Sequence, residues 1–191
     1  MSELIIKHEG MILDACCVNT LYASAQMEEI LSLITPLVTV AAYVYEEESR
    51  YIYTAPKGNP NRQEVPINLH PLVEKGLLSV VKMSTESEAT HHVHFTSKKL
   101  DDGEAITGAI AYHHNWAIAT DDKRASNIFR REMPQIQLIS TLQLLKHWAD
   151  ITNAPFDEVR LALQKVRYGA TWRPNRKDRL YWWWVEHYEG R

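Results

Sequence analysis

The sequence Gly10-Met11-Ile12-Leu13-Asp14-Ala15-Cys16-Cys17 decides the fold that we expect for this chain. A short apolar run that ends at a charged residue is typical of a strand buried inside a sheet. The next residues, from 18 to 34, carry apolar side chains at a period close to 3.6, which indicates a helix. This part of the chain therefore predicts a buried strand, closed by Asp14, and then a helix.

The alternation of short strands and helices continues along the chain. Further strands are predicted at residues 38–41, 77–81 and 116–120, with a short edge strand at 137–139. Helices are predicted to start near residue 43 and to cover residues 70–75, 101–112 and 123–131, while residues 50–66 are loop-like and hold a small hairpin. This order predicts right-handed crossovers and a parallel sheet of four or five strands, covered by helices on both faces. Beyond Thr141 the chain is predicted to be helical.

Length and composition set the broad class. The chain has 191 residues, of which 45% are hydrophobic and 24% are charged, and its formal net charge is -3. This length suits one well-buried core with at most a small appendage. A mildly acidic protein does not coat nucleic acid by charge alone, but a nuclease with an acidic metal site and a basic rim is compatible with this balance.

Cysteine usage and hydropathy bear on the cellular compartment. Cys16 and Cys17 are adjacent, and adjacent strand residues point to opposite faces, which disfavours a disulfide between them. A reducing cytoplasm is the simplest environment for two free thiols. The sequence has no run of about 18 apolar residues and no visible secretory signal, so we expect a soluble cytoplasmic protein with no membrane segment.

Acidic residues fall repeatedly where the predicted strands end. Asp14 follows the first strand, and Glu47 comes soon after the second. Asp121 and Asp122 close the fourth strand, and Glu104 opens the helix that leads into it. Ligands of open parallel sheets bind at the carboxyl ends of the strands. The topology therefore predicts that these acids lie near one another.

Each acid also has a structural explanation that needs no ligand. Asp101 and Glu104 have the spacing of a capping box, and Asp121 or Asp122 can cap the helix predicted to follow them. The glutamates at positions 46–48 are favoured by the dipole of a first helical turn. Carboxylates that converge on one crevice nevertheless repel each other by about 1 kcal/mol or more per close pair, and a cation removes this penalty. Ligation by oxygen atoms alone suits Mg²⁺ or Mn²⁺.

Four segments in succession resemble the motifs of the PIN domain family. They are Ile12-Leu13-Asp14-Ala15, Val44-Tyr45-Glu46-Glu47, Asp102-Gly103-Glu104-Ala105-Ile106 and Ala119-Thr120-Asp121-Asp122-Lys123. The similarity covers residues 10 to 145 and is closest to a prokaryotic PIN-like branch related to VapC-type toxin ribonucleases. It implies a three-layer α/β/α sandwich for residues 1–145, with residues 146–191 as a helical C-terminal extension packed on it.

The same resemblance implies roles for the acids. The catalytic cluster would contain Asp14, Glu47, Glu104 and one or both of Asp121 and Asp122. The metal ion would be held by Asp14, Glu104 and the Asp121/Asp122 pair, of which the family pattern favours Asp122 and the strand end favours Asp121. PIN domains typically hydrolyse RNA phosphodiester bonds with Mg²⁺ or Mn²⁺, which lowers the pKa of a water molecule. We therefore predict a metal-dependent endoribonuclease with an RNA substrate. An antitoxin protein would be its partner if the chain is the toxin of a toxin–antitoxin pair, and the alternative is a PIN-like module that binds RNA or protein without catalysis.

Two further features need an interpretation. The C-terminal segment interleaves basic and aromatic residues and includes the consecutive Trp182, Trp183 and Trp184. One helix cannot bury all three, so at least one is predicted to be exposed or in an interface, and we favour packing and a homodimer over RNA contact. The histidines at positions 91, 92, 94, 113 and 114 lack a recognised zinc-ligand spacing, and we interpret them as exposed loop residues.

Overall fold

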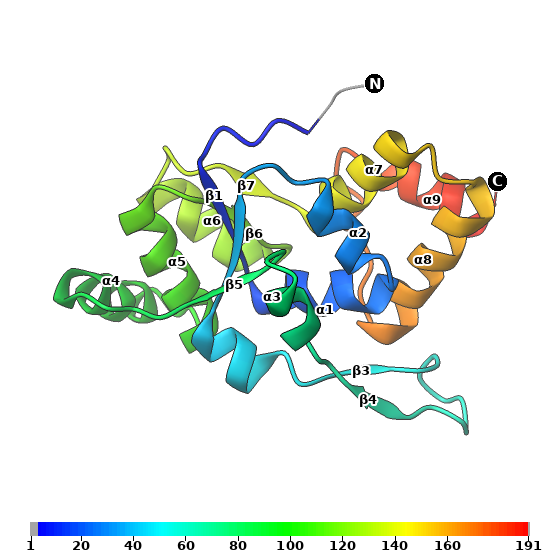
Figure 1. Cartoon of the computed structure of the whole chain (residues 1–191), viewed down its shortest axis with the longest axis horizontal. Helices are drawn as coiled ribbons and strands as arrows, with labels where there is room; N and C mark the ends of the chain where they lie inside the picture. Colours follow the sequence, from blue (N-terminus) through cyan, green and yellow to red (C-terminus); the bar gives the residue numbers. More distant parts are fainter. Residues whose placement is uncertain (1–3, 191) are drawn as a thin grey trace.

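A five-stranded parallel sheet forms the centre of the molecule (Figure 1). The structure is a computed structural model that describes residues 4–190. The strands are β1 (Gly10–Leu13), β2 (Leu37–Ala41), β5 (Ser79–Val81), β6 (Ala117–Ala119) and β7 (Leu138–Ile139), in the spatial order β5-β2-β1-β6-β7. Every neighbouring pair is parallel. The central strand β1 is buried along its whole length, as its apolar sequence predicted.

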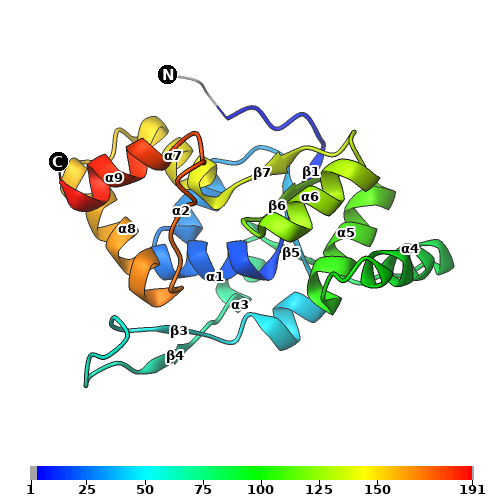
Figure 2. The same ribbon diagram turned by 180° about the vertical axis from the view of Figure 1, so that it is seen from behind.

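Helices cover both faces of the sheet, which makes the fold α/β and compatible with a three-layer α/β/α sandwich (Figures 1 and 2). One face carries α5 (Asp102–His114) and α6 (Lys123–Glu132), with α4 (Glu86–Ser97) packed on α5. The other face carries α1 (Ala15–Ser24), α2 (Met27–Ser32) and α7 (Thr141–Thr152), with α8 (Phe156–Gly169) on α1 and α9 (Tyr181–Glu189) on α8. Within residues 4–190, no helix is both long enough and apolar enough to span a membrane.

The long connection from β2 to β5 contains small elements. The turn η1 (Val44–Glu48) is π-helical, and the strands β3 (Tyr51–Tyr53) and β4 (Glu64–Pro66) form an antiparallel hairpin. The hairpin projects from the body beneath α8 in Figure 1, and β3 contacts both α1 and α8. The short helix α3 (His70–Glu74) then leads to β5. These elements match the loop, hairpin and short helix that the sequence predicted.

The helix predicted for residues 18–34 is wrong in one respect, because the structure divides it into α1 and α2. Ala25 adopts a left-handed backbone conformation with a φ of 62°, and its N–H caps α1 by donating to the carbonyl oxygen of Tyr22. The hydroxyl oxygen of Ser24 accepts the N–H of Gln26 at 3.0 Å, which stabilises the turn. The apolar period continues across this break, so the sequence pattern did not reveal it.

The helix α4 was not expected, and the interpretation of His91, His92 and His94 as loop residues is wrong. All three lie on α4, and the other histidine pair, at 113 and 114, ends α5. Among the residues of α4 only Glu88 and Phe95 are buried, so the apolar pattern carries no helical period. The available signal was the capping box that begins at residue 85.

The C-terminal helices continue the helical layer that contains α1. The boundary expected between residues 145 and 146 falls inside α7, where Leu145 and Trp148 are buried together. The predicted ranges were residues 1–145 and 146–191, and residues 1–3 and 191 of these lie outside the described part of the chain. The tryptophans of α9 differ as predicted, since Trp184 is buried and Trp182 is 74% exposed.

Candidate acidic site at the carboxyl end of the sheet

Asp14 stands where β1 leaves the sheet. Its backbone N–H donates to the carbonyl oxygen of Ala119 at 3.0 Å, so the residue is still tied to β6. Its Oδ1 accepts the N–H of Ala15 at 2.8 Å and caps α1. Its Oδ2 accepts the hydroxyl of Thr120 at 2.8 Å and the thiol of Cys16 at 3.1 Å. Asp14 is buried, and this burial raises the pKa of its carboxyl even though the hydrogen bonds act in the opposite direction.

The second acid of the site is Glu48, at the end of η1. The backbone N–H of Gly103 donates to its carboxylate, and a Cβ atom at position 103 would collide with that group. Glu47, the predicted site residue, is exposed, and its Oε2 accepts a hydrogen bond from Arg50 at 2.6 Å. The structure therefore brings Glu48 rather than Glu47 to the site.

Glu104 and Asp101 face each other at the start of α5. Asp101 accepts the N–H of Glu104 at 2.9 Å, and Glu104 Oε2 accepts the N–H of Asp101 at 3.1 Å, which completes the capping box that the spacing predicted. The same Oε2 accepts a hydrogen bond from Nη2 of Arg124 at 2.9 Å. The carboxylate of Glu104 is 8% exposed whereas the side chain of Arg124 is 55% exposed. Glu104 thus completes the cap of α5 and is also a buried carboxylate that pairs with the exposed side chain of Arg124.

Asp121 and Asp122 diverge directly after β6. Asp122 caps α6, and its Oδ1 accepts the N–H of Ala125 at 2.7 Å. Asp121 turns toward α7, where its Oδ1 accepts the N–H of Thr141 at 3.0 Å, while its buried Oδ2 has no hydrogen-bond partner among the described residues. Burial is the main cause that raises the pKa of Asp121 to about 6. Of this pair, Asp122 lies on the side of Glu104, because its charge contributes to the pKa of that residue.

We call Asp14, Glu48, Asp101, Glu104 and Asp122 the acidic cluster. Burial raises the pKa of Glu48 to about 7, and repulsion by Asp101 and Asp14 adds to the effect. Burial is also the main cause that raises the pKa of Glu104, with repulsion by Asp101 and Asp122 opposed by attraction to Arg124. The carboxyl groups of Glu48 and Glu104 therefore resist ionisation, partly because of the neighbouring acids, and a bound cation relieves such repulsion.

The donors of the acidic cluster are carboxylate oxygens, which is the ligand type that Mg²⁺ and Mn²⁺ prefer. In the present side-chain positions, no three His, Cys, Asp or Glu residues between positions 4 and 190 are grouped so that they could hold one ion. Contacts within the protein already occupy all five acids, and side chains contact two of them, since Arg124 covers Glu104 and Thr120 binds Asp14. The donor chemistry fits a hard cation, and an ion that binds Glu104 Oε2 would compete with Arg124 for the charge of this carboxylate.

Sequence reasoning missed two residues of this site. Thr120 holds the carboxylate of Asp14, and the available signal was a hydroxyl placed directly before the acidic pair. Glu48 is the last of three consecutive glutamates, and nothing in that run indicates which one turns inward. Comparison of the chain with protein-family models and with curated proteins found no match, so the resemblance to PIN domains stays a prediction from the four quoted segments.

Proposed function

We propose that this chain is a divalent-metal-dependent ribonuclease that hydrolyses RNA phosphodiester bonds at the acidic cluster. One observation carries the proposal: β1, η1 and α5 direct the carboxylates of Asp14, Glu48 and Glu104 into mutual repulsion at the carboxyl end of the sheet. That edge is where parallel sheets bind ligands. Helix capping explains Asp14 and Glu104, but it does not explain Glu48, which belongs to no N-terminal cap. The toxin role, the antitoxin partner and the homodimer remain predictions.

The surroundings of each residue suggest a different role in the proposed reaction. Mg²⁺ or Mn²⁺, when bound, would supply a lowered pKa for water and a positive charge beside the phosphate. Asp14 is held in one orientation by Thr120 and by the N–H of Ala15, so it is a preorganised anchor. Glu48 belongs to the same group of carboxylates, and its ionised carboxylate could accept a proton from water beside the ion and act as a general base. Arg124, once released from Glu104, can contact a phosphate oxygen.

A Mn²⁺ titration tests the proposal. A ligand that binds only the folded state raises its melting temperature, so Mn²⁺ at millimolar concentration should stabilise the native protein. Asp14→Asn should abolish this increase and also abolish cleavage of a single-stranded RNA. Glu47→Gln is the matched control, because it removes one negative charge from an exposed side chain next to Glu48 in the sequence. It should leave both the Mn²⁺ stabilisation and the RNA cleavage intact.

The test can also fail in an informative way. If Mn²⁺ leaves the melting temperature of the native protein unchanged and no RNA is cut, the nuclease proposal is wrong. The second candidate, a binding module without catalysis, would then be favoured. Its support is that Asp14, Asp101 and Asp122 each cap a helix and so have a structural role without any ion.

A further inference from the structure

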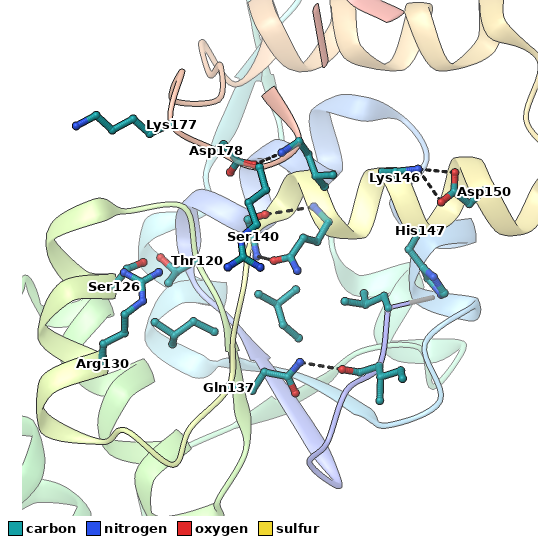
Figure 3. A pocket seen from close by; sticks show the side chains of 17 residues that line it. Thr120, Ser126, Arg130, Gln137, Ser140, Lys146, His147, Asp150, Lys177 and Asp178 are labelled. Atoms are coloured by element: carbon teal, nitrogen blue, oxygen red, sulfur yellow. Dashed lines mark hydrogen bonds and ion pairs between the residues drawn. The ribbon is translucent and has the colours of Figure 1, made fainter. Parts of the chain in front are cut away.

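A pocket of about 770 Å³ lies along the edge strand β7 (Figure 3). Its walls come from α6, α7, the chain near Leu4 and Ile5, and the segment of residues 177–180 that precedes α9. The volume is within the range of pockets that hold small molecules or single nucleotides. The segment 177–180 belongs to the part of the chain beyond the quoted PIN-like motifs.

Basic side chains outnumber acidic ones among the charged residues that line this pocket. It includes Arg130 from α6, Lys146 from α7, and Lys177 and Arg179 from the C-terminal segment. Its carboxylates are already engaged: Asp150 accepts two hydrogen bonds from Lys146, at 2.8 and 2.7 Å, and Asp178 accepts the N–H of Leu180 at 2.8 Å. Among the ion pairs of residues 4–190, none joins a carboxylate to Arg130, Lys177 or Arg179. Lys146 and Asp150 neutralise each other, and Arg130, Lys177 and Arg179 outnumber Asp178, so the pocket carries a net positive charge.

Hydroxyl groups also line this pocket, and one of them connects it to Asp14. Thr120, Ser126 and Ser140 line it, and Figure 3 shows the side chain of Arg130 directed toward Thr120 and Ser126. Thr120 also donates to Asp14 at 2.8 Å, so one residue borders both the basic pocket and the acidic cluster. The acids of the cluster are not among the residues that line the pocket, and buried Thr120 stands between the pocket and Asp14.

We propose that this pocket binds the phosphate groups of a single-stranded oligonucleotide next to the acidic cluster. The inference deepens the proposed function and rests on it for the identity of the polymer. Guanidinium groups bind phosphate through paired hydrogen bonds, and serine and threonine hydroxyls donate to the same oxygens. The acidic cluster repels phosphate, so unpaired basic side chains beside it supply the attraction that a polyanion needs. The C-terminal segment, through Arg179 and Lys177, then has a function in strand binding.

Binding of a fluorescent single-stranded RNA in EDTA, followed by anisotropy, tests the inference without any metal. The double variant Arg130→Gln/Arg179→Gln should weaken binding by about tenfold or more. It should also reduce the slope of log K against log salt concentration by about two. The matched control is Arg131→Gln/Arg176→Gln, which removes the same charge from positions that do not line the pocket. All four arginines are exposed, so folding should persist, and circular dichroism checks it.

The outcomes separate this inference from the proposed function. Equal losses in the double variant and the control, or no binding by the native protein, would overturn the pocket assignment. Selective loss in the double variant, with no RNA cleavage in Mn²⁺, would support the pocket and reject the nuclease. If the native protein cleaves RNA but the double variant binds RNA normally, the nuclease proposal is supported and the pocket assignment is rejected. Competition by a mononucleotide, but not by inorganic phosphate, would show that the pocket contacts more than the phosphate.

Discussion

Glu48 becomes protonated near neutral pH, because burial and the neighbouring carboxylates raise its pKa from 4.5 to about 7. In the unfolded chain the group has its ordinary pKa. Between the two values the folded state binds more protons than the unfolded state, so the free energy of unfolding falls as the pH rises from about 4.5 to about 7. Ionised Glu48 is therefore a source of instability above pH 7 that a bound cation would remove.

Glu48→Gln should be more stable than the native protein at pH 8 and equally stable at pH 4, where Glu48 is neutral. Since Glu48 is only partly buried, solvent screening reduces the gain, and we expect a melting temperature about 2–4 °C higher, or about 1 kcal/mol. Thermal unfolding at both pH values measures the difference. Glu47→Gln serves as the control, and a similar increase in that variant would contradict the role given to Glu48.

Single residues of the site were predictable only where local chemistry fixes them. Asp14 and Glu104 could be identified because a strand end and a capping box determine where each side chain lies. Glu47 was chosen over Glu48 because the PIN-like motif Val44-Tyr45-Glu46-Glu47 ends at Glu47, and the sequence itself does not distinguish the two. The choice between them depends on the π-helical geometry of η1 and on the space left by Gly103, neither of which has a pattern in the sequence.

At the scale of elements, the pair α4 and α5 depends on a buried charge. Glu88 is 1% exposed, and its Oε2 accepts the N–H groups of Ser84 at 2.7 Å and Thr85 at 2.9 Å. Its Oε1 lies 3.3 Å from Nε2 of His114 at the end of α5. Burial opposes the ionisation of Glu88, but the hydrogen bonds prevail and lower its pKa. One side chain thus caps α4 and connects it to α5.

Glu88→Ala should reduce the free energy of unfolding by about 1–3 kcal/mol, because it leaves two backbone N–H groups without their acceptor. Urea denaturation measures the change. Glu86→Ala, in the same helical turn but exposed, should change stability by less than about 0.5 kcal/mol. Equal effects of the two substitutions would mean that the capping box contributes nothing to stability.

Most elements could be predicted, and the exceptions share a cause. The strands of the sheet have continuous apolar runs because helices cover both faces, and such runs are visible in the sequence. The helix α4 packs on α5 rather than on the sheet and buries only two of its residues, Glu88 and Phe95. A helix with so little buried surface gives no periodic signal, so only its cap at residue 85 could have indicated it.

At the scale of the whole molecule, Trp184 is the one residue of α9 that is buried. Trp184 is 5% exposed, and its ring centroid lies 5.4 Å from those of Trp172 and Tyr188. Trp182, two residues earlier, is 74% exposed. The two side chains therefore differ in environment although they belong to the same helix.

Trp184→Ala should reduce stability by about 3–5 kcal/mol, as expected for a large buried side chain. Trp182→Ala should change it by less than about 0.5 kcal/mol in the monomer. Urea denaturation at low protein concentration compares them. A large loss in Trp182→Ala that grows with protein concentration would instead support the predicted homodimer, with Trp182 in its interface.

The arrangement of the whole sheet was predictable as parallel, but the neighbours of each strand were not. The order β5-β2-β1-β6-β7 places β6 beside β1, and this pairing brings Thr120 to Asp14 across 106 positions of sequence. Contacts of this kind depend on the crossover path of the chain. The sequence indicated which acids end strands, but not which hydroxyl or arginine would meet them.

The ion pair of Arg124 with Glu104 gives the proposed metal and strand sites a way to influence each other. Arg124 donates to a carboxylate oxygen that a cation would also approach, so a bound cation would weaken this ion pair. An arginine released in this way could bind a phosphate group, and a bound strand would in turn favour binding of the cation. Without either ligand, the ion pair offsets the charge of the buried Glu104.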